Sequence, residues 1–118
     1  MKIKNDGDLQ NVPVTMEGAK NVEMKILIGP DDGSSNMTMR LFSVLPGGHT
    51  PYHTHDYEHL VRVQKGTGVV TDAQGTKHEL SAGQSVFVAP GENHQFANPF
   101  AQTFEFTCTI PNPKSACA

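Results

Sequence analysis

The sequence predicts an all-β protein, a sandwich or barrel built from many short strands. Turn signals that contain Gly or Pro recur along the chain, among them "GPDDG", "PGG", "KGTG", "AQG" and "PGEN". The segments between these turns are short, rich in Val, Ile, Phe and Thr, and without a convincing helical period. Short strands at near-regular spacing are typical of antiparallel sandwiches and barrels.

In chain order, we expect strands at 24–28, 37–45, 58–64, 68–73, 76–81, 85–89 and 103–110. A further strand should begin near His94, after the turn "PGEN", with Phe96 on the same face. Segment 11–22 is expected to hold a strand around 12–15, with room for one turn of helix. The first ten residues and the last six are expected to be mobile unless they dock.

Composition excludes several classes of function. The net charge is −3, and the nine Lys and Arg residues are scattered rather than gathered into a stripe, so nucleic acid is not an expected partner. Apolar runs are too short to span a bilayer, and the N-terminus has no apolar signal region, which favours a soluble cytoplasmic protein without a membrane partner. The two cysteines do not predict a disulfide scaffold, and a bond between Cys108 and Cys117 is not expected.

Residues 53–59, "HTHDYEH", hold three of the six histidines. Side chains alternate between the faces of a strand, so an extended backbone over 53–63 would place the odd-numbered residues on one face. That face carries three histidines followed by core residues, namely His53, His55, Tyr57, His59, Val61 and Val63. The opposite face is mostly polar. The alternation therefore predicts that the histidines point inward.

Three inward histidines predict a metal site. Each neutral imidazole in an apolar cavity needs a partner for its acceptor nitrogen, and one divalent cation satisfies all three. A bulge would turn Glu58 inward in place of His59, so this carboxylate remains an alternative ligand. We expect His94 as the fourth ligand, whereas His49 and His78 are expected not to bind the metal.

At these residues the sequence resembles the cupin family. The first cupin motif, Gly-x5-His-x-His-x3,4-Glu-x6-Gly, is matched with His59 in place of Glu by Gly47, His53, His55, His59 and Gly66. The second motif, Gly-x5-Pro-x-Gly-x2-His-x3-Asn, is similar to Gly83, Pro90, His94 and Asn98. In this second motif, six residues rather than five separate Gly83 from Pro90, and Gly91 follows the proline directly.

The resemblance covers roughly residues 37–110 and implies one cupin domain over 1–118. Such a domain is a jelly-roll β-barrel (a double-stranded β-helix), here with an N-terminal arm at about 10–28 and a C-terminal tail at 111–118. More closely, "MRLFSVLPGG", "HTHDYEH" and "EFTCTIP" resemble small one-domain cupins with a four-histidine site, a subgroup known from a thermophilic bacterial manganese cupin. That likeness implies a homodimer with one divalent metal per chain, Mn or Fe first and Zn, Ni or Cu as alternatives. The implied ligands are His53, His55, His59 and His94.

The alternation in "TFEFTCTI" predicts further residues of the cavity. Its inward face, together with the neighbour of His94, should line the pocket with Phe96, Phe104, Phe106, Cys108 and Ile110. Three residues are candidates for chemistry. Tyr57 could donate a proton or simply pack, and Cys108 could be a soft ligand or an inert core residue. Arg40 would lie either at a wet interface or at the cavity mouth, where it could receive an anionic substrate.

Four functions remain open from the sequence. The first is a dioxygenase-like oxidoreductase that acts on a small organic substrate, because four neutral histidines and adjacent open positions on Mn or Fe suit dioxygen. The second is an isomerase, decarboxylase or lyase that uses the metal as a Lewis acid. The third is a non-catalytic barrel that binds a small ligand through the metal, and the fourth is a barrel that has lost its metal. The sequence does not identify the substrate or decide whether the protein is an enzyme.

Overall fold

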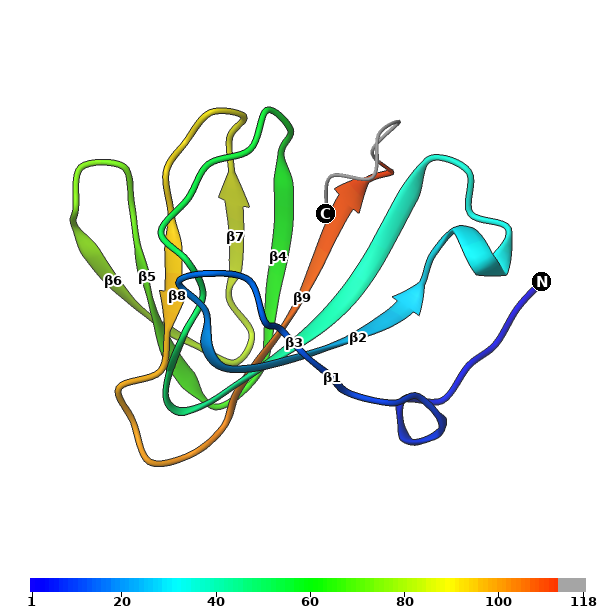
Figure 1. Cartoon of the computed structure of the whole chain (residues 1–118), viewed down its shortest axis with the longest axis horizontal. Coiled ribbons are helices and arrows are strands. Elements are labelled where there is room, and N and C mark those ends of the chain that lie inside the picture. Colours follow the sequence, from blue (N-terminus) through cyan, green and yellow to red (C-terminus); the bar gives the residue numbers. More distant parts are fainter. Residues whose placement is uncertain (113–118) are drawn as a thin grey trace.

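The protein is an antiparallel sheet that curls on itself (Figure 1). The computed structural model describes residues 1–112, so the expectations for Cys117 and for the tail beyond residue 112 lie outside it. Short 3-10 turns, η1 (Asp6–Asp8) and η2 (Pro30–Asp32), are the helical elements of this range. The all-β prediction is confirmed by the strands β1 (Val12–Pro13), β2 (Lys20–Ile28), β3 (Met37–His49), β4 (His59–Lys65), β5 (Thr67–Thr71), β6 (Lys77–Ser81), β7 (Ser85–Val88), β8 (Gln95–Ala97) and β9 (Phe104–Pro111).

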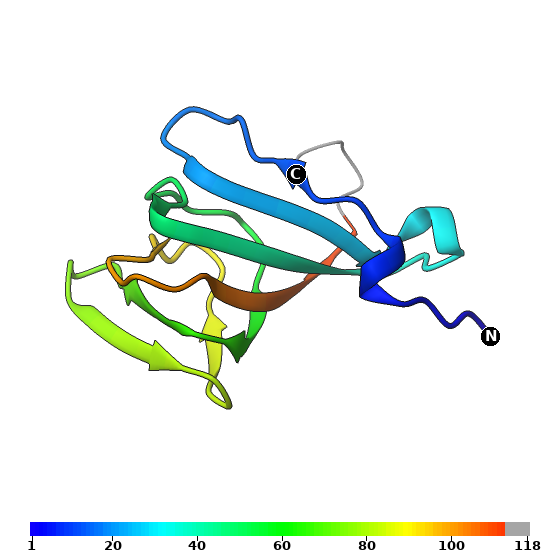
Figure 2. The same cartoon turned by 90° about the horizontal axis from the view of Figure 1, so that it is seen from below.

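Strand β3 organises the sheet, because it pairs with β2, β8 and β9 along its length. The order across the sheet is β6-β5-β8-β3-β9-β4-β7, with β2 joined to β3 and β1 joined to β2. Strands β5, β6 and β8 curl toward β4 and β7, whereas β9, β3 and β2 fan outward (Figure 1). Seen from below, β1 and β2 lie on one side of β3 and the β5–β6 hairpin lies on the other (Figure 2).

The core sits inside this curl and follows the predicted alternation. Register places Phe42 beside Phe106, and Val44 beside Phe104, across β3 and β9. Val44 and Phe104 are both 0% exposed. The inward residues of β9 are all buried, and its outward residues are half-buried or exposed, because successive side chains of a strand point to opposite faces.

Two glycines let β5 approach β9. Gly66 has a φ of 77°, in the left-handed region that suits glycine, and it begins the turn into β5. A Cβ at Gly68 would lie 2.2 Å from the ring of Phe104. This close contact is possible only without a side chain, so Gly68 allows the fully buried ring of Phe104 to pack directly against the β5 backbone.

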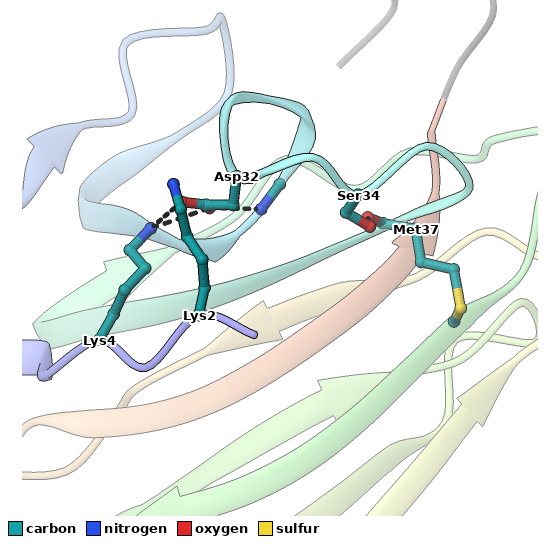
Figure 3. Close-up of polar contacts among 6 residues, drawn as sticks. Lys2, Lys4, Asp32, Ser34 and Met37 are labelled. Atoms are coloured by element: carbon teal, nitrogen blue, oxygen red, sulfur yellow. Dashed lines mark hydrogen bonds and ion pairs between the residues drawn. The ribbon is translucent and has the colours of Figure 1, made fainter.

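The N-terminus docks on the η2 turn through Asp32 (Figure 3). Lys4 Nζ lies 2.9 Å and Lys2 Nζ lies 3.3 Å from the Asp32 carboxylate, and the Gly29 amide donates to the same group at 3.0 Å. The hydrogen bond from Lys4, followed by that from Gly29, lowers the pKa of the Asp32 carboxyl to about 2. The sequence led us to expect mobile first residues unless they dock, and these contacts dock Lys2 and Lys4 on the η2 turn.

Some expected boundaries differ from the structure. Strand β2 begins at Lys20 rather than at 24, because Lys20 pairs with His49 at the extended end of β3. The turn of helix allowed for in 11–22 is absent from that segment, and 3-10 turns occur at η1 and η2 instead. Strand β8 begins at Gln95, just after His94. Within residues 1–112, no helix is long and apolar enough to cross a membrane.

Candidate functional site

Backbone pairing brings the two histidine-bearing segments together. The His53 amide donates to the His94 carbonyl at 3.1 Å, and the His94 amide donates to the His53 carbonyl at 2.9 Å. His59 begins β4, and residues 54–58 lie outside the strands. The predicted alternation nevertheless holds through this bend, because His53, His55 and His59 face inward while Thr54 and Glu58 are exposed.

The four histidine rings lie around a common centre. Their centroids are 4.5 Å apart for His53 and His55, 5.3 Å for His55 and His59, 4.9 Å for His59 and His94, and 5.1 Å for His94 and His53. Rings bound to one ion at about 2.1 Å, with ligand angles of roughly 90–110°, would have centroids roughly 4.6–5.3 Å apart. The spacing of the rings therefore fits a shared metal ion.

The ring nitrogens are less well placed than the rings. Among residues 1–112, no three His, Cys, Asp or Glu side chains are already arranged to hold an ion. The positions of the rings depend mainly on the backbone, whereas the directions of their nitrogens depend on the soft χ2 torsion of each side chain. The backbone thus supplies proximity, and individual rings would have to turn before their nitrogens converge.

The protonation state of the cluster suits metal binding, because a ligating imidazole must be neutral. Burial lowers the pKa of His53 to about 4, with further lowering by the nearby His55, His94 and Arg40. Burial, followed by His94 and His55, lowers the pKa of His59 to about 3. The pKa of His55 is also lowered, mainly by burial. These three rings are neutral at pH 7 and offer lone pairs.

Two ring nitrogens bear on the fit of a metal. The Nδ1 atom of His94 lies 2.9 Å from the Glu92 carbonyl, a contact that favours a proton on Nδ1 and leaves Nε2 as the acceptor. The Nδ1 atom of His59 is buried and has no hydrogen-bond partner among the described residues. An unpartnered buried nitrogen is costly, and coordination of a cation by this ring is one way to relieve that cost.

The histidines open into a cavity of about 300 Å³. Its described lining is largely apolar and contains no carboxylate. The lining residues are Val12, Pro13, Val14, Thr15, Met16, Met24, Arg40, Phe42, Thr50, Pro51, His53, His55, His59, His94, Phe96, Phe106 and Cys108. Such a cavity would hold a small, mostly apolar organic molecule beside the histidine cluster.

The residues of the predicted lining divide between the cavity and the core. Phe96, Phe106 and Cys108 line the cavity of about 300 Å³, whereas Phe104 and Ile110 are not among its lining residues. Both are buried on the inward face of β9, Phe104 against Gly68. The inward face of β9 is longer than the cavity, so its two ends pack into the core rather than bordering the open space.

Other candidate residues lie around the cluster. Tyr57 stacks on the ring of His55 at 4.8 Å, lies 5.1 Å from the ring of His59 and packs against the core, outside the cavity lining. The exposed Glu58 does not line the cavity. His78 is exposed and lies 2.8 Å from Asp72, whereas the ring of His49 contacts the Thr50 carbonyl. Neither of these two histidines lines the cavity with the cluster.

Sequence reasoning missed one wall of the cavity, which comes from the N-terminal arm. Val12, Val14 and Met16 lie in or just after β1, and β1 pairs with β2 so that Val12 is opposite Met24. No local signal shows that the arm folds back across the cavity, because that placement depends on its pairing with β2.

Phe42 is a further lining residue that sequence reasoning missed. The alternation of side chains in β3 could have identified it, because Phe42 shares a face with Arg40.

The Cupin_2 family model, a cupin domain, matches residues 40–110. The chain belongs to the cupin family. The curled antiparallel sheet is accordingly the cupin jelly roll. No curated protein matches this cupin.

Solved structures share its fold. The polyketide cyclase RemF from Streptomyces resistomycificus is 32% identical, with a TM-score of 0.92, and the match covers 96% of this cupin and 80% of that chain. A protein described as a predicted oxalate decarboxylase from Thermotoga maritima is 23% identical, with a TM-score of 0.83 and coverage of 93% and 98%. A sugar phosphate isomerase from Silicibacter pomeroyi is 19% identical, with a TM-score of 0.81 and coverage of 95% and 76%. The last two likenesses concern the fold alone.

Proposed function

We propose that this cupin is a metal-dependent enzyme that cyclises or isomerises an apolar, carbonyl-rich substrate. It would bind one divalent transition metal per chain through His53, His55, His59 and His94. The observation that carries the proposal is the meeting of four histidine rings in one largely apolar cavity of about 300 Å³. Mn or Fe is the first expectation for the metal, and Zn, Ni and Cu are alternatives that imidazole ligands accept equally well.

Similarity to a polyketide cyclase supports the reaction class. In an aldol-type cyclisation, a methylene carbon loses a proton and bonds to a carbonyl carbon, whose oxygen gains a proton. The reaction consumes no oxidant and needs no reductant. A bound divalent ion would supply Lewis-acid polarisation of carbonyl oxygens.

The residues of the chain have three roles in this proposal. The neutral histidines add no negative charge, so a divalent ion held by them would keep its positive charge and suit electron-rich oxygens. The hydrogen bond between His94 and the Glu92 carbonyl holds one ring in a defined orientation. Phe42, Phe96 and Phe106 provide apolar walls that bind the carbon skeleton and exclude water.

A dioxygenase-like oxidoreductase is the second candidate. The aromatic lining and the absence of a carboxylate from the described cavity wall are compatible with it. Four histidine ligands on Mn or Fe, metals that take up to six ligands, would leave positions for dioxygen and a substrate. This function consumes oxygen, whereas cyclisation does not. A barrel that only binds a ligand would turn over no substrate at all.

The first test is metal content by elemental analysis of tag-free protein purified without chelator. The native chain should carry near-stoichiometric metal, His59→Ala should carry much less, and the exposed His78→Ala should match the native chain. Absence of metal from the native chain, even after reconstitution, would sink the proposal. Sedimentation at micromolar concentration tests the accompanying prediction of a homodimer.

The second test uses a synthetic poly-β-ketone, with products followed by mass spectrometry in air and under nitrogen. A product of unchanged mass, or one that has only lost water, formed equally without oxygen supports the cyclase. A product that contains added oxygen, formed only in air, favours the oxidoreductase. Binding of the poly-β-ketone without any product would favour a barrel that only binds a ligand.

A further inference from the structure

Arg40 places a positive charge inside the cavity wall. It lies on the inward face of β3, directly across from Cys108 of β9 in the sheet register. Its Nη2 donates to the Cys108 Sγ at 3.3 Å, and its guanidinium carbon lies 4.8 Å from the centre of the Phe42 ring. The side chain is thus held by a thiol and an aromatic face, both of which line the same cavity.

The charge of Arg40 is not matched by a protein anion. No ion pair among residues 1–112 includes Arg40, and no Asp or Glu lines the cavity in that range. Its Nε is buried and finds no hydrogen-bond partner there. Arg40 as a whole is half-buried. A guanidinium has five N–H donors and a thiol is a weak acceptor, so most of its donors have no protein partner among the described residues. Even partial burial of a cation without a counter-ion is unfavourable.

Arg40 acts on the same space as the histidine cluster. Arg40 lines one cavity of about 300 Å³ together with His53, His55, His59 and His94. A molecule that fills the cavity can therefore touch the guanidinium with one group and the histidine cluster with another. The walls between them are apolar, with Phe96 and Phe106 among them.

We propose that Arg40 is the anion-binding residue of this cavity, and that the substrate is an apolar molecule with an anionic oxygen group, a carboxylate or an ionised enol. The inference rests on the proposed function, since it names the substrate class for the same cavity. The planar guanidinium binds a carboxylate or an enolate oxygen through paired N–H donors. The bound anion supplies the counter-charge that the described lining lacks, so neutral analogues of the same shape leave the guanidinium unpaired.

The experiment compares two aromatic probes of nearly equal shape, 2-naphthoate and its neutral amide 2-naphthamide. Binding is measured by calorimetry on the purified protein, both metal-loaded and stripped with chelator, because the carboxylate could also bind a metal directly. A third probe, 4-nitrophenol, is used at a pH above the pKa of its hydroxyl group. Its phenolate oxygen stands in for the oxygen of an ionised enol. Arg40→Met removes the charge and keeps an apolar side chain, and Arg62→Met is the matched control, because Arg62 is the other arginine of the chain and is exposed on β4.

In the stripped native protein, naphthoate should bind more tightly than the amide by about tenfold or more. Arg40→Met should abolish this preference while amide affinity stays within about threefold, and Arg62→Met should match the native protein. A preference that survives in folded Arg40→Met would overturn the inference, as would an equal loss of both probes. If Arg40→Met does not fold, Arg40→Lys replaces it. Naphthoate should then bind several-fold more weakly, and an unchanged affinity would overturn the inference.

If binding of the phenolate depends on Arg40, the anionic group of the substrate is assigned as an ionised enol. If only naphthoate binding depends on Arg40, the group is assigned as a carboxylate. Failure of this inference is distinguishable from failure of the proposed function. If the native chain contains no metal but still prefers naphthoate through Arg40, the proposed metal enzyme is wrong and the anion site is supported. If turnover depends on metal but no preference depends on Arg40, the proposed enzyme is supported and the anion site is wrong.

Discussion

The main chains of His53 and His94 are joined by two reciprocal hydrogen bonds, of 3.1 and 2.9 Å. This bridge aligns the segment before β4 with the turn before β8, and it brings the rings of the two residues to 5.1 Å. The histidine cluster therefore depends on long-range backbone pairing as well as on the local spacing of the residues in "HTHDYEH". The predictions below test the cluster, the packing around it and the docked N-terminus.

Removal of metal should lower thermal stability. A ligand that binds only the folded state stabilises it by about 2.7 kcal/mol at a free concentration a hundredfold above its Kd. Chelation should therefore lower the unfolding temperature of the native protein and of the control His78→Ala. It should leave His59→Ala almost unchanged. Scanning calorimetry measures the unfolding temperature of each protein. An equal fall of this temperature in all three proteins would show that the chelator does not act through the histidine cluster.

Gly68→Ala should destabilise the fold. The added Cβ would lie 2.2 Å from the Phe104 ring, which is fully buried and cannot move aside without disturbing the core. Overpacking of this kind costs about 1–3 kcal/mol. Urea unfolding measures the loss, with Gly7→Ala as the control, since nothing lies within 4 Å of a Cβ at Gly7. A loss no greater than that of Gly7→Ala would mean that β5 shifts freely.

Asn98→Ala should also destabilise the protein. The Asn98 side chain is 1% exposed and donates to the carbonyls of Val44 and Gln102, while its oxygen accepts the Phe100 amide. Loss of one partner from a buried hydrogen bond costs about 1–3 kcal/mol. Denaturant unfolding should show this loss, and hydrogen exchange should show faster exchange of the Phe100 amide. An amide that exchanges at the native rate would contradict the assigned contact.

Asp32 should make stability depend on acidic pH. Its folded pKa, about 2, is below the ordinary value of 3.8, so the unfolded state binds more protons between these values. The stabilisation is present above about pH 4 and is lost as the pH falls toward 2. The unfolding temperature of native protein should thus fall more steeply across this window than that of Asp32→Asn. Parallel curves would show that the contacts with Lys4 and Gly29 do not stabilise the folded state.

Much of the candidate site follows from period-two patterns, which are a local property of the chain. The inward direction of His53, His55 and His59 was predicted from Val61 and Val63, because residues of equal parity share a face. That prediction held across a bend, since the residues between the histidines still alternate between inward and exposed positions. The predicted metal-ligand set, metal identity and dimer remain predictions.

The all-β class, most strand positions and the inward histidines were determined by the sequence alone, because side-chain alternation and turn residues act over a few neighbouring positions. Tertiary structure decided which inward residues border the open space. Arg40 meets Cys108 only because β3 pairs with β9, and Val14 reaches the cavity only because β1 folds back on β2. Phe104 is excluded from the cavity by its packing against Gly68. Strand pairing and sheet curvature join residues far apart in the chain, and no local pattern encodes the shape of the space that they enclose.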